Sequence, residues 1–492
     1  MSKSLHFLSH EKKLSFNQGY VVPIGCIEAL PGDIFQHKVA ALLRTQPMLA
    51  PVMHTATVKI HHWFVPLRLI WDDFEKFITG GKDGLDASVA PTLDTGTIVS
   101  GDLSNHLGLP AGASLSVSAL PFRAYAHIWN EYYRDQDLQT ELPISTASGV
   151  DTTTSKVLKR ACWEKDYFTS ARPTTQKGLD VEIPLSGTAP IKGIGKSGTA
   201  SAAGGGTRYE TDGTTPTYGR EVAANTVTAG AVSYFETDAA GKLNLRADLS
   251  NISAVSLNDL RLALRLQQYK ENMLRKGSRM VERLQHAFGI KPEDTRLDIA
   301  EYLGGGKQVL QFSEVLQTAQ GSNPVGTLAG HGIAAMQSNR YRKFITEYGF
   351  VLSFVIVRPK TAYMDGMHKM WHRTVKEDYF QPELQNIGMQ PIKNKEIFAR
   401  HGTPNGTFGY QDRDDSYRHM FDQVSGELAG TLDFWHMGRK FASAPALNSA
   451  FVEYEGVDRV FAAPVADDFI GRFKHDLRVK RLVHQSGRPS VF

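Results

Sequence analysis

Histidines that could bind a metal ion stand out first in this sequence. The segment HTATVKIHHWFVPLRLIWDDF, residues 54–74, contains His54, His61 and His62. Its alternating apolar and polar residues predict a β-strand, in which His54 and His62 are separated by roughly 27 Å. His61 points to the opposite face together with Trp63. These histidines cannot share an ion, and we interpret them as packing residues.

A second histidine pair occurs in MHKMWHR, residues 367–373. His368 and His372 have the i, i+4 spacing that places two ligands on one face of a helix. A zinc hydrolase motif of this kind requires glutamate directly after the first histidine, where this chain has Lys369. Contacts within the protein are therefore the favoured interpretation, and we expect no metal site.

Other residues with chemical potential also fail the requirements of known motifs. The acidic cluster DRDDS, residues 412–416, has Tyr417 and Gln423 where a calcium loop of the EF-hand type needs glycine and glutamate. The GKS of KGIGKSG, residues 192–198, follows Pro190 where a phosphate-binding loop needs its first glycine. No catalytic motif is found, so the sequence predicts a protein without enzymatic activity, metal or cofactor.

A basic stripe near the C-terminus is more informative. In FIGRFKHDLRVKRLV, residues 469–483, alternate positions are mostly apolar, which predicts a strand with one buried face. Its other face carries four cations and one acid: Arg472, Lys474, Asp476, Arg478 and Lys480. Such a row of cations suits contact with the backbone of a single-stranded nucleic acid. A solvated outer face without a partner is the alternative, and the sequence leaves both open.

The elements that must position these residues are mainly strands. Alternation predicts a strand over residues 52–64, ended by Pro66, and a short helix over 67–78 that stops at Gly80. Further strands are expected at 181–185, 350–357 and 469–483. Scattered strands with long connections favour a sandwich or jelly roll over a parallel α/β sheet.

Two helical insertions are expected among the strands. Residues 120–139 carry apolar and aromatic side chains at helical spacing. Residues 256–289 form the longest helical pattern, with a kink or break expected at Gly277 and a stop at Gly289. Between them, residues 195–242 contain no Leu, Ile, Met or Trp, so this segment cannot form a core and is expected to be an exposed loop.

Composition narrows the class of protein. The chain has 492 residues, 41% of them hydrophobic, which suffices for a large core. Its formal net charge of +4 gives no general case for nucleic-acid binding, so any such contact must be local. The two cysteines are far apart and predict no disulfide framework. No apolar run is long enough to predict a signal peptide or a membrane span, and a protein made in a cytoplasm is expected.

Several long motifs resemble one known family. LPFRAYAHIWNEYYRDQDLQ (120–139), DYFTSARPTTQKG (166–178) and RLDIAEYLGGG (296–306) are similar to segments of the major capsid protein of the Microviridae, gokushovirus-like branch. LRTQPMLAPVMHTATVKIHHWFVPLRLIWDDFEKFITGG resembles the N-terminal region of that family, and residues 395–437 resemble its C-terminal third. The matches follow the order of the family over nearly the whole chain.

The resemblance implies a mainly β fold, an eight-stranded viral jelly roll with long loop and α-helical insertions, in a single capsid domain over residues 1–492. It implies a virion protein, made in the host cytoplasm, that assembles with its own copies into a T=1 icosahedral shell around a circular single-stranded DNA phage genome. It also implies a small basic DNA-binding packaging protein and a pilot protein as partners. Residues 195–242 correspond to the family's surface insertion, which is tied to a host-surface receptor.

Two other classes of function remain alternatives at this point. A secreted or phage-borne β-sandwich that binds or cleaves glycans would need paired carboxylates, for which Asp412, Asp414 and Asp415 are the dense cluster available. A nucleic-acid-binding module acting alone would depend on the basic stripe. No residue that contacts DNA is implied by the resemblance, so Arg472, Lys474, Arg478 and Lys480 are a hypothesis from the residues themselves.

Overall fold

The protein is described by a computed structural model that covers its strand framework and most of its insertions. The described residues are 3–181, 191–192, 194–197, 208–210, 220–222, 233–236, 246–247, 257–275, 277, 279–316, 318, 326–385 and 387–484. The chain forms two compact units: residues 1–175 with 273–492, and residues 176–272. Each unit is considered by itself below.

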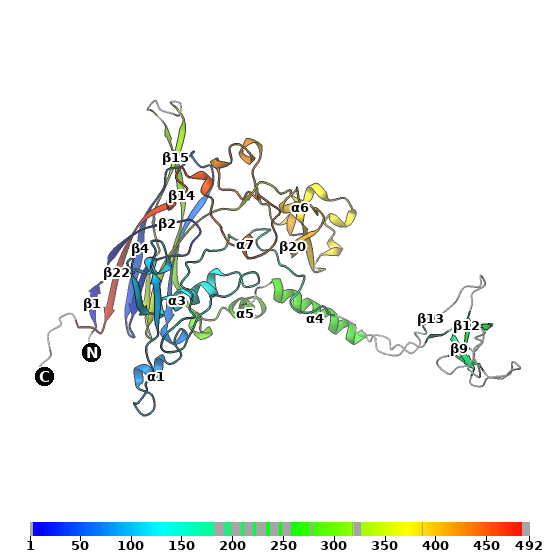
Figure 1. The fold of residues 1–492 in the computed structure, drawn as a ribbon, viewed down its shortest axis with the longest axis horizontal. Helices are drawn as coiled ribbons and strands as arrows, with labels where there is room; N and C mark the ends of the chain where they lie inside the picture. The colour runs from blue at the N-terminus through cyan, green and yellow to red at the C-terminus, as the bar shows by residue number, and fades with distance from the viewer. Residues whose placement is uncertain are drawn as a thin grey trace. The chain divides into compact units, whose positions relative to one another are not determined.

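The first unit is built on a curled antiparallel sheet (Figure 1). One half has the strand order β2–β22–β4–β15 and the other β3–β17–β5–β14, and the hairpin of β14 and β15 joins them. The strands are β2 (His10–Phe16), β3 (Val22–Ala29), β4 (Ile34–Thr45), β5 (Ala56–Pro66), β14 (Glu301–Leu316), β15 (Leu328–Gln337), β17 (Gly349–Pro359) and β22 (Phe469–Arg481). This is the arrangement of a jelly roll, and the expected fold class is confirmed.

Two short strands extend the first half of the sheet. β1 (Ser4–Phe7) continues the edge made by β2 against β22, and β16 (Tyr341–Phe344) pairs with β4 beyond the end of β15. The two outer edges of the curled sheet approach each other where the Lys12 ammonium on β2 donates to the carbonyl of Pro23 on β3, at 3.0 Å. The sheet therefore encloses a core between its two halves.

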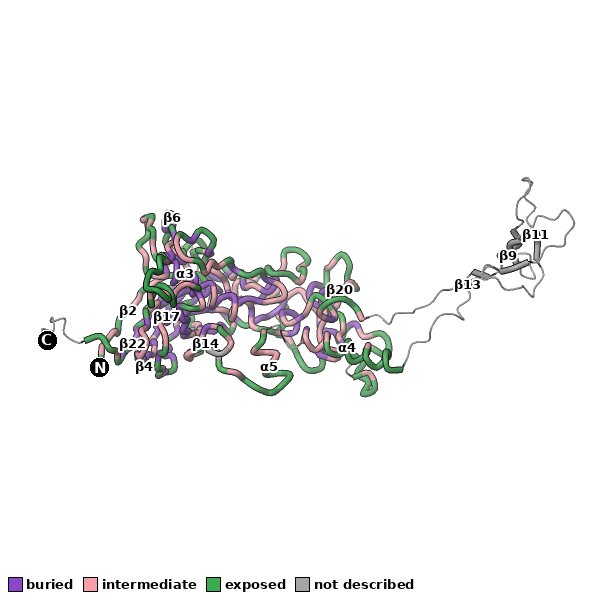
Figure 2. The backbone as a smooth tube through the Cα atoms, turned by 90° about the horizontal axis from the view of Figure 1, so that it is seen from below, coloured by how far each residue is buried: buried purple, intermediate pink, exposed green. Residues whose placement is uncertain are grey.

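The core follows from strict alternation along the strands. On β22 the inward residues are buried and largely apolar while their neighbours face outward, as the sequence predicts. The inward residues of the two halves meet in one cluster that includes Val39, Val58, Val355 and Phe473. Figure 2 shows the buried stretches of the backbone in purple. Burial of these side chains, each worth roughly 1.5–3 kcal/mol, holds the two halves together.

Three histidines lie inside this apolar core. His37, His62 and His475 are fully buried. His475 Nε2 faces the carbonyl of Ile24 at 3.1 Å, and a carbonyl only accepts, so Nε2 carries the proton. His475 Nδ1 then accepts from His37 Nε2 at 3.0 Å, and His37 Nδ1 accepts from the Tyr341 hydroxyl at 3.0 Å. The chain of hydrogen bonds is complete with both of these imidazoles neutral.

The third histidine is satisfied by two hydroxyls. His62 Nδ1 lies 2.8 Å from Ser353 Oγ, and its Nε2 lies 3.1 Å from Ser338 Oγ. Burial lowers the pKa of His37 to about 2, of His62 to about 3 and of His475 to about 4. His62 is one of the β5 histidines that the sequence predicts to be packing residues, and it is buried and hydrogen-bonded.

The expected strands are found with small shifts at their ends. β5 begins at Ala56 rather than residue 52 and ends at Pro66, while β17 and β22 match the runs at 350–357 and 469–483. The prediction of a helix over 67–78 is wrong for its first half, where a 3-10 turn at Leu67–Leu69 precedes α1 (Phe74–Thr79). That helix ends at Gly80 in the left-handed conformation, as expected. Most of the strand expected at 181–185 lies outside the described residues.

Helices occupy the long insertions. The helix expected over 120–139 is shorter, with α3 (Leu120–Ile128) followed by a π-helical turn (Trp129–Tyr133), because the polar residues after Tyr133 form turns instead. The pattern over 256–289 breaks as expected at Gly277, where φ is +84°, giving α4 (Leu257–Arg275) and α5 (Met280–Phe288). Gly289 ends α5 with φ at +69°.

The remaining elements are short. In the first unit they are α2 (Leu103–Leu107), α6 (Asn394–Ile397), α7 (Ser449–Val452), β6 (Thr92–Thr97), β7 (Ser114–Ser118), β18 (Ala362–Tyr363), β19 (Met389–Lys393), β20 (Thr407–Asp412) and β21 (Asp422–Gln423). In the second unit, β9 (Ile194–Ser197), β10 (Arg208–Glu210), β11 (Arg220–Val222) and β12 (Ser233–Glu236) form a four-stranded sheet. The rest of the expected surface loop at 195–242 lies outside the described residues.

Candidate nucleic-acid interface

The four cations singled out in the sequence lie on one face of β22. Arg472, Lys474, Arg478 and Lys480 are exposed, and each alternates with a buried residue. Asp476 lies between them on the same face and is half-buried. The alternation of β22 thus brings the predicted residues together in a straight row on the outer surface of the sheet.

Neighbouring strands widen this row into a surface that the sequence analysis missed. Lys13 on β2 lies opposite Arg472, and Lys38 on β4 lies opposite Asp476. The other additions are Arg44 on β4, Arg342 on β16 and Arg340, which precedes β16. We call this surface the basic face: Lys13, Lys38, Arg44, Arg340, Arg342, Arg472, Lys474, Arg478 and Lys480, with the carboxylates Glu11 and Asp476.

The two carboxylates neutralise only part of the basic face. Glu11 accepts two hydrogen bonds from the Arg472 guanidinium, at 2.6 and 3.1 Å, and this pairing lowers the pKa of the Glu11 carboxyl. Asp476 lies 3.1 Å from Arg340 and 3.8 Å from both Lys38 and Arg478. Both acids are therefore already shared among the surrounding cations.

Five cations of the basic face keep their charge uncompensated by a short ion pair. Among the described residues, no carboxylate lies within 4.0 Å of Lys13, Arg44, Arg342, Lys474 or Lys480, and all five are exposed. Like charges at this density repel one another in the isolated chain. This arrangement of charges needs counter-ions in the free chain. A polyanion that binds here pairs with the cations, and the counter-ions are released.

Exposed aromatic rings stand among these cations. Phe7 on β1 lies opposite Arg478 in the strand register and is 68% exposed, and Phe344 on β16 is 52% exposed. The Arg478 guanidinium lies 5.8 Å from the Phe7 ring centre, and the Lys3 ammonium 4.8 Å from that of Phe344. Aromatic rings beside cations are the combination by which proteins bind single strands without sequence preference.

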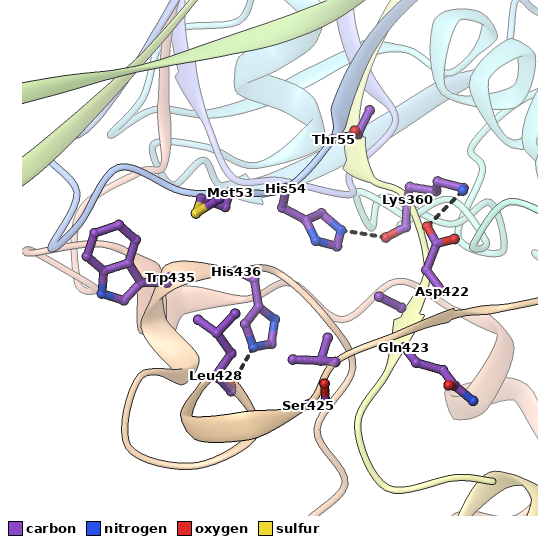
Figure 3. Close-up of a pocket in the computed structure, with 12 residues that line it drawn as sticks. Met53, His54, Thr55, Lys360, Asp422, Gln423, Ser425, Leu428, Trp435 and His436 are labelled. Atoms are coloured by element: carbon purple, nitrogen blue, oxygen red, sulfur yellow. Dashed lines mark hydrogen bonds and ion pairs between the residues drawn. The ribbon is translucent and has the colours of Figure 1, made fainter.

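A cavity lies between the segment that precedes β5 and the long insertion after β17 (Figure 3). It has a volume of about 640 Å³ and is lined by His54, Lys360, Asp422, Trp435 and His436 among others. His54 Nε2 donates to the Lys360 carbonyl at 2.7 Å, and His436 Nε2 donates to the Leu428 carbonyl at 2.8 Å. The Lys360 ammonium pairs with Asp422 at 2.7 Å. Both imidazoles and the Lys360 ammonium are thus engaged by neighbouring groups of the cavity wall.

The acidic cluster DRDDS does not form paired catalytic carboxylates. Asp412 lies 2.9 Å from Arg275, whereas Asp415 lies 3.1 Å from Arg418 and 3.0 Å from His419. Asp412 and Asp415 are thus paired with different cations and not with each other. Within the part of the chain that is described, no group of three or more His, Cys, Asp or Glu residues could hold a metal ion.

The remaining histidine candidates are packing residues. His61 lies 2.7 Å from the Tyr133 hydroxyl, which also accepts from Trp63 Nε1 at 3.1 Å, so the less apolar face of β5 is covered by the π-helical turn after α3. His368 Nδ1 accepts from the amide of Met370, and His372 lies 3.5 Å from the buried Glu396. The segment that contains both histidines forms a 3-10 turn, Lys369–His372, so the i, i+4 spacing does not place them on one face of an α-helix.

A jelly roll with long insertions is an architecture typical of viral capsid proteins. The chain belongs to the phage capsid protein (F protein) family, whose model matches residues 1–491. It is 34% identical to "Capsid protein VP1" of Bdellovibrio phage phiMH2K, over 98% of this chain and 96% of that protein. Its identity to "Capsid protein VP1" of Chlamydia phage 1 is 31%, over 96% of this chain and 93% of the relative. The protein of the same name from Spiroplasma virus 4 is 32% identical, over 94% of this chain and 90% of that protein.

The resemblance found in the sequence is therefore confirmed. The protein is a structural capsid protein of the virion that assembles with its own copies, and its relatives are named as structural proteins, not enzymes. None of the described helices is both long enough and apolar enough to cross a membrane.

Proposed function

We propose that this capsid protein builds a T=1 icosahedral shell around a circular single-stranded DNA genome, with the basic face of each copy turned toward the DNA. The observation that carries the proposal is the concentration of nine cations and two carboxylates on one side of the sheet. The whole chain has a net charge of only +4, so the rest of the molecule is net acidic. Electrostatics alone would turn this face to the phosphates.

The spacing of cations along β22 supports contact with a flexible single strand. On β22, Arg472 and Lys474 lie two residues apart, as do Arg478 and Lys480, which spaces the members of each pair by roughly 6.8 Å along the strand. Exposed rings at Phe7 and Phe344 flank these cations and offer stacking surfaces to unpaired bases. The basic face is made of strands, without a projecting helix that could read a duplex, so the proposed contact is with the backbone and independent of sequence.

Other partners belong to the same proposal. They are a small basic DNA-binding packaging protein, which would neutralise part of the genome, and a pilot protein. We further propose that residues 1–492 act as one capsid domain, made in the host cytoplasm, and that residues 195–242 form the surface insertion that meets a host-surface receptor.

The test replaces Arg472, Lys474, Arg478 and Lys480 with glutamine. All four are exposed, so shells should still form, while the DNA retained per shell should fall severalfold. The measurement is the ratio of DNA to protein in particles purified by density-gradient centrifugation, after nuclease treatment. As a matched control, four exposed cations outside the basic face, Lys82, Lys291, Lys376 and Arg400, are replaced in the same way.

Two results would overturn the proposal. One is an unchanged DNA content in shells of the quadruple variant. The other is an equal fall in DNA content in the control variant, which would mean that total charge matters and the position of the basic face does not.

A further inference from the structure

The hairpin of β14 and β15 extends beyond the sheet to which it belongs. β5 pairs with β14 only as far as Ala56 opposite Leu310, whereas β14 continues to Leu316. In Figure 1 the hairpin projects past the ends of the neighbouring strands. Residues 311–316 of β14 are therefore paired on one side, with β15, and have no described strand on the other.

The hydrogen bonds of Gly330 and Gly332 fix which backbone groups face the open side. The Met48 amide donates to the Gly330 carbonyl at 2.9 Å, and the Gly330 amide donates to the Met48 carbonyl at 3.2 Å. Gly330 therefore makes no backbone hydrogen bond to Glu314, which lies opposite it on β14. The amide of Gly332 donates to the Thr45 hydroxyl and likewise turns away from Phe312. In an antiparallel pair bonded and non-bonded positions alternate. The amides and carbonyls of Phe312, Glu314 and Leu316 therefore point out of the sheet.

This open edge carries one charged side chain, Glu314, and otherwise lacks the usual protection against strand addition. Natural edge strands are blunted by proline, lysine, a bulge or a cover. Residues 311–316, with the sequence QFSEVL, contain no proline or lysine, and their register with β15 runs without a bulge. Val315 and Leu316 are 47% and 57% exposed, so apolar side chains accompany the unpaired backbone groups.

We propose that residues 312–316 of β14 are a docking edge onto which an extended segment of a second copy adds as a further strand. A chain of this family is surrounded by its own copies in the shell, so every copy presents the same edge to a neighbour at the same distance. Strand addition satisfies the backbone groups of Phe312, Glu314 and Leu316 together and covers Leu316. The contact holds copies together through main-chain bonds and depends little on side-chain identity.

The test uses the single substitution Glu314→Pro in the full-length chain. Proline removes the outward amide of residue 314 and leaves the bonds between β14 and β15, because that amide does not take part in them. Glu314→Ala is the matched control, since it removes the same side chain but keeps the amide. We expect at least a tenfold loss of shells relative to free subunits for E314P, with wild-type assembly for E314A, measured by density-gradient sedimentation.

A second measurement needs no substitution. Hydrogen exchange at the amides of residues 312, 314 and 316 should be fast in free subunits and slowed at least tenfold in shells. The amides of residues 313 and 315 should be protected in both states, because they bond to β15. Normal assembly of E314P, equal failure of E314A, or equally fast exchange at residue 314 in shells and subunits would each overturn the docking edge.

Discussion

The inward-facing histidines show how single residues set the chemistry of this barrel. His37, His62 and His475 occupy positions where most strands of the core carry valine or phenylalanine. Each ring nitrogen among them has a hydrogen-bond partner, so they are stable only as neutral imidazoles. Gly25 allows this arrangement, because a Cβ at that position would lie 2.7 Å from Cε1 of His475.

These histidines should make the fold sensitive to acid. Burial lowers their pKa values to between about 2 and about 4, while in the unfolded chain they titrate near 6.5. Stability is therefore fully present above pH 6.5 and is lost as the pH falls below it. The loss between pH 7.5 and pH 5 is roughly 2 kcal/mol for each histidine that stays neutral. His62→Gln should therefore reduce the loss of unfolding free energy between pH 7.5 and pH 5 by roughly 2 kcal/mol. Urea unfolding of the free subunit at both pH values measures this.

The control for this prediction is His286→Gln, which replaces an exposed histidine and should leave the pH dependence as it is. Identical pH profiles of the free energy of unfolding in wild type and His62→Gln would contradict the assignment of a buried neutral imidazole.

Glu11 reduces the positive charge of the basic face at one position. Its carboxylate binds Arg472 and lies close enough to Lys474 and Lys13 for their charges to lower its pKa further. Glu11→Gln should therefore free positive charge and tighten binding of the chain to oligo(dT) by on the order of twofold to fivefold at low salt. Fluorescence anisotropy at several salt concentrations checks this, and weaker binding would contradict the proposed role of the face.

Among the elements, α3 carries the insertion that covers β5. Arg123 on α3 is fully buried and donates to Asp151 at 2.8 Å and to the carbonyls of Ile70 and Ala147, both at 2.9 Å. Asp151 is also fully engaged, because the amides of Thr153 and Thr154 donate to it. The helix is thereby fixed to two loops that have little other regular structure.

Removal of Arg123 should loosen this whole insertion. Arg123→Ala leaves the Asp151 carboxylate buried without its cation, which typically costs about 3–5 kcal/mol in the free energy of unfolding. Lys76→Ala breaks an exposed ion pair with Asp73 and should leave the unfolding midpoint unchanged. Chemical denaturation of both variants checks the prediction, and equal midpoints would contradict it.

The elements also show where sequence reasoning works. Pro66, Gly80, Gly277 and Gly289 end or break elements where the sequence predicts, because the conformational limits of proline and glycine are local. The ends of helices without such residues are less predictable. α3 ends well before residue 139, because the polar residues that follow are held by tertiary contacts, such as the Gln139 side-chain amide that donates to Glu453 at 3.3 Å.

Over the whole molecule, charge is distributed unevenly although its sum is small. Nine cations on one face exceed the net charge of the chain, so that face dominates association with a polyanion. The number of cations that take part can be counted from the effect of salt on binding. Each cation that no longer binds a phosphate of a single strand should reduce the slope of log K against log salt by about 0.7.

Replacement of Arg472, Lys474, Arg478 and Lys480 by glutamine should therefore reduce that slope by about 3 for oligo(dT). Titration of the free subunit over a range of salt concentrations gives the slope directly. The control variant at Lys82, Lys291, Lys376 and Arg400 should leave it unchanged, and a reduction of equal size there would contradict a localised interface.

Some features of this protein follow from the sequence alone. Period-two alternation gives β22 its buried and exposed faces, because neighbouring side chains of a strand must point to opposite sides. Motifs in family order indicate the capsid fold. Alternation also predicts that His61 and His62 point to opposite faces of the strand and cannot share an ion.

Only the tertiary structure decides which strands lie side by side. It places Lys13, Arg44 and Arg342 beside the four cations of β22, across hundreds of residues of sequence. It likewise joins His37 to His475 by a hydrogen bond and packs the His62 ring against that of His37. Among the described strands, it leaves the edge of β14 open at Phe312, Glu314 and Leu316. Pairing between distant strands depends on how the whole core closes, and no local pattern of residues contains that information.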